Sequence, residues 1–82
     1  MPLYMDVHRN VEADATAVAE AHRADLAVAE EHGVSYRRYW VDDDEGAVFC
    51  LFDAPSKAAG EAVHREAHGL VADEIYEVEE GE

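Results

Sequence analysis

Aliphatic side chains alternate with polar or aromatic ones along residues 3–9, which predicts a β-strand with one apolar face. The apolar positions are Leu3, Met5 and Val7. The positions between them are Tyr4, Asp6 and His8. We expect the apolar set to face the hydrophobic core and the other set to point outward, on the opposite face of the sheet.

Two later segments have the pattern of helices. Residues 14–32 contain neither Gly nor Pro and are rich in Ala and acidic residues, which predicts a long helix. Gly33 follows and favours a left-handed helix end. A second helix is predicted from Ser56, as its N-cap, to about His68, where Gly69 ends it.

The remaining apolar segments are short and typical of strands. Residues 34–41 are aromatic and β-branched, and the polar turn 42–46 joins them to residues 47–53 as a hairpin. Because residues 47–53 form an almost continuous apolar run, we expect a central strand that is buried on both faces. A last short strand is predicted at residues 73–79.

The predicted order is β-α-β-β-α-β, which is the ferredoxin-like arrangement of the α+β class. We expect residues 1–82 to form one domain, with a four-stranded antiparallel sheet, its first and third strands central, and both helices on one face. The other face of the sheet stays open in a single chain. A chain of 82 residues buries only a small core, so a homodimer that covers this face is expected.

The charge balance narrows the range of partners. Twenty acidic residues against six basic ones give a formal net charge of −14, which disfavours nucleic acid and anionic membranes. Lys57 is the single lysine, and acid excess with few lysines is typical of proteins that work in high salt. We expect no membrane segment and no signal peptide, and the lone Cys50 suits a reducing compartment, so the expected location is the cytoplasm.

Histidines are the most distinctive chemical groups in this chain. His64 and His68 lie four residues apart on the second predicted helix, so both imidazoles share one face and can hold one metal ion. Glu61, on the same side, can supply an oxygen donor. Two solvated surface histidines are the simpler interpretation. His32, at the end of the first helix, is interpreted as a helix cap.

Two further groups are candidates for metal binding. Asp6 and His8 point to one side of a central strand, and Cys50 on the neighbouring strand can approach them. Cys50 is otherwise a small buried apolar residue. His22 and Asp25, three residues apart on the first helix, form either a chelating pair or a partly buried histidine oriented by a carboxylate.

Together these segments resemble a small nickel-binding family with a ferredoxin-like fold. The matching segments are residues 5–8 (MDVH), 21–26 (AHRADL), 48–51 (VFCL), 54–56 (APS), 63–69 (VHREAHG) and 72–78 (ADEIYEV). The resemblance implies a dimer that binds Ni²⁺ near its surface, in nickel sequestration or homeostasis and without established catalysis. The implied metal-site positions are His8, His22, Cys50, His64 and His68.

Two other functions stay open at this point. Dimers of ferredoxin-like units can form an α+β barrel with a pocket between sheet and helices, as in small cofactor-free monooxygenases and isomerases. In such an enzyme His8 is the base, and the pocket is lined by Tyr4, His8, Tyr39 and Trp40. The third possibility is an interaction module that uses its open sheet face.

Overall fold

The computed structural model describes residues 1–12 and 14–81. Its elements are β1 (Leu3–His8), α1 (Ala15–Ala29), a 3₁₀ turn η1 (Glu30–His32), β2 (Ser35–Asp42), β3 (Ala47–Asp53), α2 (Lys57–Ala67) and β4 (Glu74–Glu77). The predicted β-α-β-β-α-β order is therefore confirmed, and the strand and helix bounds agree with the predicted ones to within a few residues.

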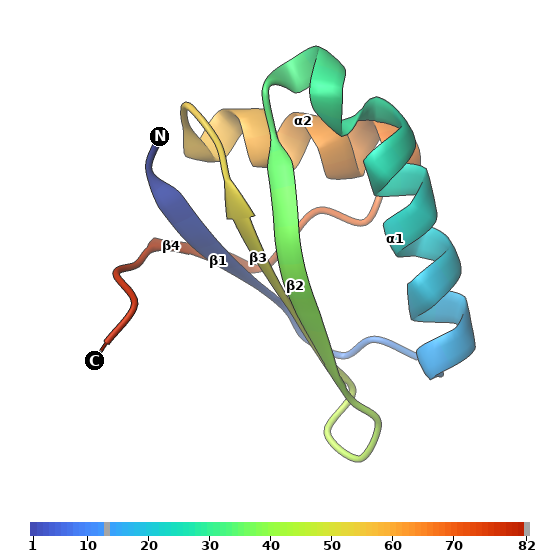
Figure 1. Ribbon diagram of the computed structural model, residues 1–82. Coiled ribbons are helices and arrows are strands. Elements are labelled where there is room, and N and C mark those ends of the chain that lie inside the picture. The colour runs from blue at the N-terminus through green and yellow to red at the C-terminus, as the bar shows by residue number, and fades with distance from the viewer. Residues whose placement is uncertain (13, 82) are drawn as a thin grey trace.

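The four strands form one antiparallel sheet in the order β2-β3-β1-β4, so β1 and β3 are central as predicted. Figure 1 shows α1 and α2 packed on the same side of this sheet. The hydrophobic core lies between the two layers, where Val18 of α1 and Val63 of α2 are buried together with Phe52 of β3. Among the described residues, no helix lies on the other face of the sheet.

Local signals in the sequence set the helix ends. The Asp14 carboxylate accepts a hydrogen bond from the Ala17 backbone N–H at 2.9 Å, and Ser56 caps α2 in the same way. Gly33 adopts a left-handed conformation with φ of 71°, as the sequence predicts. The predicted helix 14–32 differs only in its last turn, which tightens to 3₁₀. Within the described part of the chain, no helix is long and apolar enough to cross a membrane.

The expected orientation of β1 is wrong. Tyr4, Asp6 and His8 lie on the face that the helices cover, and all three are buried. Alternation predicts which residues share a face, but it does not say which face is covered. The polar set can be buried because α2 supplies a histidine that pairs with Asp6, and this pairing offsets the cost of removing the charge from water.

The expectation that β3 is buried on both faces is also wrong for a single chain. Burial alternates along β3, and only the helix-side residues, among them Cys50 and Phe52, are fully buried. Phe49 and Leu51 on the open face stay partly exposed. Trp40, which is paired with Phe49 in the register, is 45% exposed on the same open face. The apolar run therefore supplies two apolar faces, of which the helices cover one.

A close approach of α2 to the sheet positions the functional region. An added Cβ at Gly60 would lie 2.6 Å from the Phe52 ring, so the α2 backbone rests directly on this ring. His64 lies four residues, or about one turn, further along α2. It therefore projects from the underside of the helix onto the central strands.

Candidate metal centre

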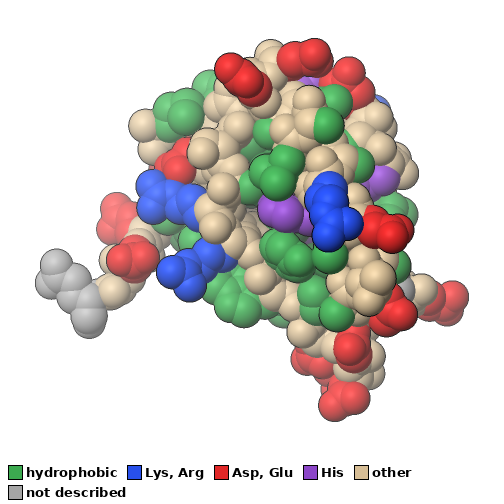
Figure 2. All heavy atoms as spheres, turned by 45° about the vertical axis from the view of Figure 1, so that its right-hand side comes forward, with side chains coloured by type: hydrophobic (Ala, Val, Ile, Leu, Met, Phe, Trp, Pro, Cys, Tyr) green, Lys and Arg blue, Asp and Glu red, His purple; other side chains and the backbone are tan. Residues whose placement is uncertain are grey.

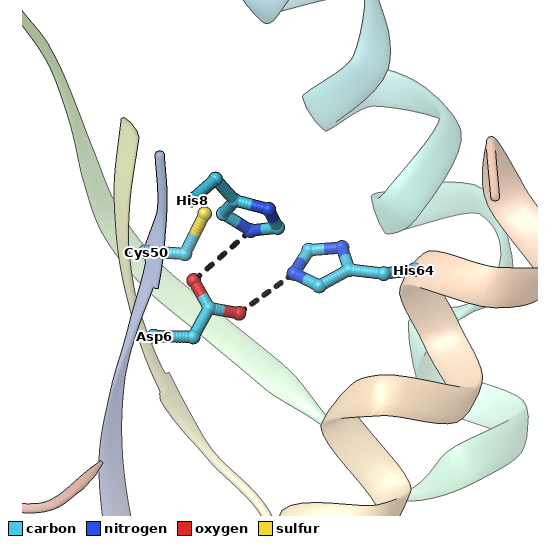
Figure 3. Close-up of side chains that lie close together, drawn as sticks. All are labelled: Asp6, His8, Cys50 and His64. Carbon is cyan, nitrogen blue, oxygen red and sulfur yellow. Dashed lines mark hydrogen bonds and ion pairs between the residues drawn. The ribbon is translucent and has the colours of Figure 1, made fainter. Parts of the chain in front are cut away.

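Four side chains converge between α2 and the central strands, and we call them the central cluster: Asp6, His8, Cys50 and His64 (Figure 3). Asp6 and Cys50 are paired across β1 and β3, so their side chains share the covered face. His8 follows two residues after Asp6 on that face, and His64 reaches down from α2. One potential ligand atom from each residue lies within 4.8 Å of all the others.

His64 bridges two carboxylates. Its Nε2 lies 2.8 Å from Asp6 Oδ2, and its Nδ1 lies 2.8 Å from Asp25 Oδ1 on α1. Ionised carboxylates only accept hydrogen bonds, so without a metal both ring nitrogens donate and the ring is an imidazolium. Burial alone lowers the pKa of His64, but the hydrogen bonds to Asp25 and Asp6 outweigh it and raise this pKa to about 11.

The Asp6 carboxylate is only partly satisfied. Burial raises its pKa, but hydrogen bonds and charge from His64 and His8 outweigh this effect and lower the pKa below its usual value. Oδ2 accepts from His64, while Oδ1 lies 3.3 Å from His8 Nε2. Oδ1 is buried and has no well-aligned hydrogen bond from any described residue. A buried anionic oxygen that is met only by this loose contact is suited to a cation.

Cys50 contributes a thiol to the same space. Burial raises its pKa to about 11, although a hydrogen bond with His64 opposes this shift. The group is therefore a protonated thiol at neutral pH. A metal that takes the sulfur as a thiolate must displace this proton.

His68 lies beside the central cluster, and its two ring nitrogens are already engaged. The Leu70 backbone N–H donates to His68 Nδ1 at 3.1 Å, so in the neutral ring the proton is on Nε2. Nε2 lies 3.0 Å from Asp25 Oδ1 and donates to it. Burial lowers the pKa of His68, which favours this neutral form. Asp25, His64 and His68 also come close enough to form a second donor set, centred on the Asp25 carboxylate.

The expectation of a site made by surface histidines is therefore wrong for two of them. His64 is 1% exposed and His8 is 7% exposed. His64 directs Nε2 toward β1, while His68 packs against the His64 ring, with centroids 5.2 Å apart, and shares Asp25 with it, so the two rings do not act as a simple exposed pair. Glu61 belongs to none of the donor sets that the described residues form.

His22 and His32 lie outside the central cluster. The His22 ring packs against Tyr39, with ring centroids 4.5 Å apart. Its expected partner, Asp25, instead faces the two histidines of α2. His32 Nε2 lies 2.7 Å from Glu66 Oε2, so it joins η1 to α2. With Glu31 these two residues form a third, more exposed donor set.

Asp25 is the important residue whose role the sequence analysis missed. It is 3% exposed and orients the His64 ring through Nδ1. A signal was present, because Asp25 lies seven residues after Val18 and four before Ala29, both of which are buried. A carboxylate inside an apolar helical stripe requires a buried partner.

A cavity of about 420 Å³ opens above the central cluster, and His8, Cys50 and His64 lie on its lining. On the helix side of the molecule, Figure 2 shows histidine among hydrophobic side chains, with carboxylates around them. His8 and Tyr39 line the cavity, as the enzyme alternative requires. Tyr4 is instead part of the core, and Trp40 lies on the open face, so neither contributes.

The fold and the cluster together define a small ferredoxin-like α+β protein with a buried histidine–carboxylate–thiol centre. The chain belongs to the family described as "Nickel responsive protein SCO4226-like", whose sequence profile matches residues 4–78. This is a nickel-responsive family and not an enzyme family, so the enzyme alternative gains no support. The resemblance inferred from the sequence is thereby confirmed.

A solved structure agrees with this assignment. The crystal structure of SCO4226 from Streptomyces coelicolor A3(2) matches with a TM-score of 0.90 and 38% sequence identity. The match covers 98% of this chain and 99% of that chain. A comparison with curated proteins finds no match.

Proposed function

We propose that this protein binds Ni²⁺ at the central cluster and serves in nickel sequestration or homeostasis, without catalysis. The carrying observation is the buried Asp6 Oδ1, whose contact with His8 Nε2 is a loose 3.3 Å, surrounded by imidazole and thiol groups whose ligand atoms lie within 4.8 Å of one another. Membership of a nickel-responsive family supports nickel as the ion.

The chemistry of the donors suits a borderline transition metal. Imidazole and thiolate groups bind such ions well, and a carboxylate adds a negative charge. In this proposal His8, Cys50 and His64 are ligands together with Asp6. His64 would bind through Nε2 while its Nδ1–H donates to Asp25, the carboxylate–histidine arrangement that fixes the ring at many metal sites.

His68 and His22 have supporting roles in this proposal. His68 binds Asp25 through Nε2 and receives the Leu70 N–H at Nδ1, so it holds the Asp25 carboxylate in place. His22 lines the cavity beside the centre. Of the five positions that the resemblance implies, we therefore assign three as ligands.

Metal binding must release protons. The proton on His64 Nε2 and the proton of the Cys50 thiol occupy the positions that the metal takes. We therefore expect about two protons to be released per ion near neutral pH, and an affinity that rises with pH.

Calorimetry of the untagged, metal-free protein tests this proposal. Titration with Ni²⁺ in buffers of different ionisation enthalpy should give one buried site per chain with about two protons released. Cys50→Ala and His8→Ala should each weaken this site at least tenfold. His32→Gln, in the exposed donor set, is the matched control and should leave it unchanged. If His32→Gln removes nickel binding while His8→Ala does not, the assignment is overturned.

We also propose that a second copy of the chain covers the open sheet face. Trp40 and Tyr76 are 45% and 50% exposed there, beside the partly exposed Leu51. Covering such a surface gives a short chain the apolar burial that one core lacks. Sedimentation should show a dimer for the wild-type protein, and Leu51→Lys should dissociate it. Leu26→Lys, at an exposed position of α1, is the control and should leave the dimer intact. A monomeric wild-type protein at 100 µM would refute the dimer.

A further inference from the structure

The cavity above the central cluster ends on three of the proposed nickel ligands. Its lining includes His8, Cys50 and His64, which are all buried. Other lining residues are exposed, among them Leu70 at 59% and Val71 at 36%. Because one cavity contacts both kinds of residue, it connects the centre with the solvent. We call its buried end the floor and its exposed lining residues the rim.

The cavity has the volume for a hydrated metal ion. It encloses about 420 Å³. A divalent ion with six bound waters takes up about 180 Å³, at about 30 Å³ for each water. The ion can therefore enter the cavity with its hydration shell and exchange waters for protein donors at the floor. It need not lose its hydration before it reaches a ligand.

The rim carries a net negative charge. Its charged residues are Arg9, Glu12 and Asp73. The Arg9 side chain pairs with Glu74 at 2.6 Å, so these two charges offset one another. Within residues 1–12 and 14–81, neither the Glu12 nor the Asp73 carboxylate forms an ion pair. Two uncompensated carboxylates at the opening raise the local concentration of a divalent cation.

Backbone hydrogen bonds keep both carboxylates at the opening. The Arg9 backbone N–H donates to Asp73 Oδ2 at 2.6 Å, which fixes this carboxylate beside the end of β1. Glu12 follows Val11, whose backbone N–H donates to the Gly46 carbonyl at 2.8 Å. The two acidic residues therefore belong to anchored parts of the chain.

From the continuity of floor and rim, and from the two rim carboxylates without a cationic partner, we infer that this cavity is the route by which Ni²⁺ enters and leaves the centre. Glu12 and Asp73 attract the hydrated ion to the opening, and the ion then passes Ala21 in the wall on its way to the floor. The inference rests on the proposed function, because it takes the floor residues as nickel ligands. The two rim carboxylates determine the rate of binding and are not ligands in the final site.

Stopped-flow kinetics of Ni²⁺ binding to the untagged, metal-free protein tests the role of the rim. The double substitution Glu12→Gln with Asp73→Asn removes two charges and keeps an oxygen that can accept the Arg9 N–H. In about 20 mM KCl it should slow association about three- to tenfold and leave dissociation unchanged. In about 1 M KCl the difference should fall below about twofold, because the screening length is then about 3 Å.

A matched control removes the same charge on the opposite face of the sheet. Glu79 and Glu80 are exposed and lie beside Leu3 and Leu51 of the open face. The double substitution Glu79→Gln with Glu80→Gln should therefore slow association less than about twofold in the same buffer of low salt.

A third variant tests the passage itself. Ala21 is half-buried in the lining, and Ala21→Leu narrows the cavity. An obstruction between solvent and centre should slow association and dissociation by the same factor, at least about twofold, and leave the equilibrium affinity unchanged. Ala27→Leu, at an exposed position of the same helix outside this lining, should change neither rate. Amide spectra of both variants show whether the fold is kept.

Three results would overturn the inference. They are wild-type association rates in the rim variant at low salt, equal effects of the rim and control double substitutions, and unchanged rates in a folded Ala21→Leu protein. Each of these, with normal equilibrium binding of Ni²⁺ by the wild-type protein, refutes the route alone. A wild-type protein that binds no Ni²⁺ in the calorimetric titration refutes the proposed function, and the route with it.

Discussion

At the scale of single residues, His64 determines how the buried charges of the interior are paired. It places one cationic ring between Asp6 and Asp25, which are both at most 3% exposed. Two buried carboxylates without this ring would face each other across an apolar core. The same ring that stabilises the metal-free protein is also a ligand in the proposed nickel site.

Replacing this ring should therefore destabilise the metal-free protein. His64→Gln leaves two buried carboxylates without a cation, and breaking a buried ion pair on one side costs about 3–5 kcal/mol. The free energy of unfolding, measured by urea denaturation with a chelator present, should fall by this amount. His32→Gln removes an exposed partner of Glu66 and should cost less than about 1 kcal/mol. Equal effects of the two substitutions would contradict the interpretation.

The pH dependence of stability follows from the same residue. The pKa of His64 rises from 6.5 in the unfolded chain to about 11 in the folded one. The contribution of His64 to the free energy of unfolding is therefore complete below pH 6.5. Above that value it declines by about 1.4 kcal/mol per pH unit. The lowered pKa of Asp6 affects stability at acidic pH instead. The contribution of Asp6 to the free energy of unfolding is complete above pH 3.8 and is lost as the pH falls further.

Urea denaturation of the metal-free protein at pH 6 and pH 8.5 measures this slope. The wild-type protein should be less stable at pH 8.5, and the difference should largely vanish in His64→Gln. A wild-type stability that rises between these pH values would show that His64 is neutral in the folded protein.

At the scale of elements, the separation between α2 and the sheet controls the centre. α2 carries His64, whereas Asp6, His8 and Cys50 belong to the two central strands. Gly60 sets this separation, because its lack of a side chain lets the helix backbone rest on the Phe52 ring. The centre therefore depends on a position that contributes no donor.

Gly60→Ala tests this dependence. The added Cβ would lie 2.6 Å from Phe52, so α2 must move outward and His64 must move away from Asp6. Despite the higher helix propensity of Ala, overpacking should cost about 1–3 kcal/mol and should weaken nickel binding at least tenfold. Ala58→Gly, at an exposed position of α2, should lower stability by about 1 kcal/mol and spare the nickel affinity. An unchanged affinity in Gly60→Ala would contradict this role.

At the scale of the whole molecule, self-repulsion is the dominant electrostatic feature. A formal net charge of −14 is distributed over a body of 32 × 31 × 18 Å. The screening length falls from about 10 Å at 0.1 M salt to about 3 Å at 1 M. Salt should therefore weaken repulsion across the molecule, while the buried pairs of His64 are screened much less. Adaptation to high salt stays a prediction from composition.

Thermal unfolding in KCl measures the self-repulsion. Between 0.05 and 2 M KCl the unfolding temperature should rise by at least about 5 °C, which corresponds to about 1 kcal/mol for a domain of this size. The double substitution Asp43→Asn with Asp44→Asn, in the exposed hairpin turn, should raise the temperature at low salt and reduce the increment. A transition that KCl does not move would contradict the argument.

The sequence by itself determined the order and bounds of the elements, because these depend on near neighbours. Asp14 and Ser56 cap helices through bonds three residues away, and Gly33 ends one by its own conformation. The order of elements then led to the ferredoxin-like sheet order. The histidine-bearing segments were also sufficient to identify the family, and the match over residues 4–78 confirms this assignment.

Only the tertiary structure decided which face of β1 is buried and which carboxylates each histidine contacts. Alternation has two equally regular interpretations, and the choice depends on partners far along the chain. His64 pairs with Asp6 across 58 residues and with Asp25 across 39. No local pattern contains such pairs, because the stabilisation of a buried carboxylate exists only once α2, α1 and β1 have packed together.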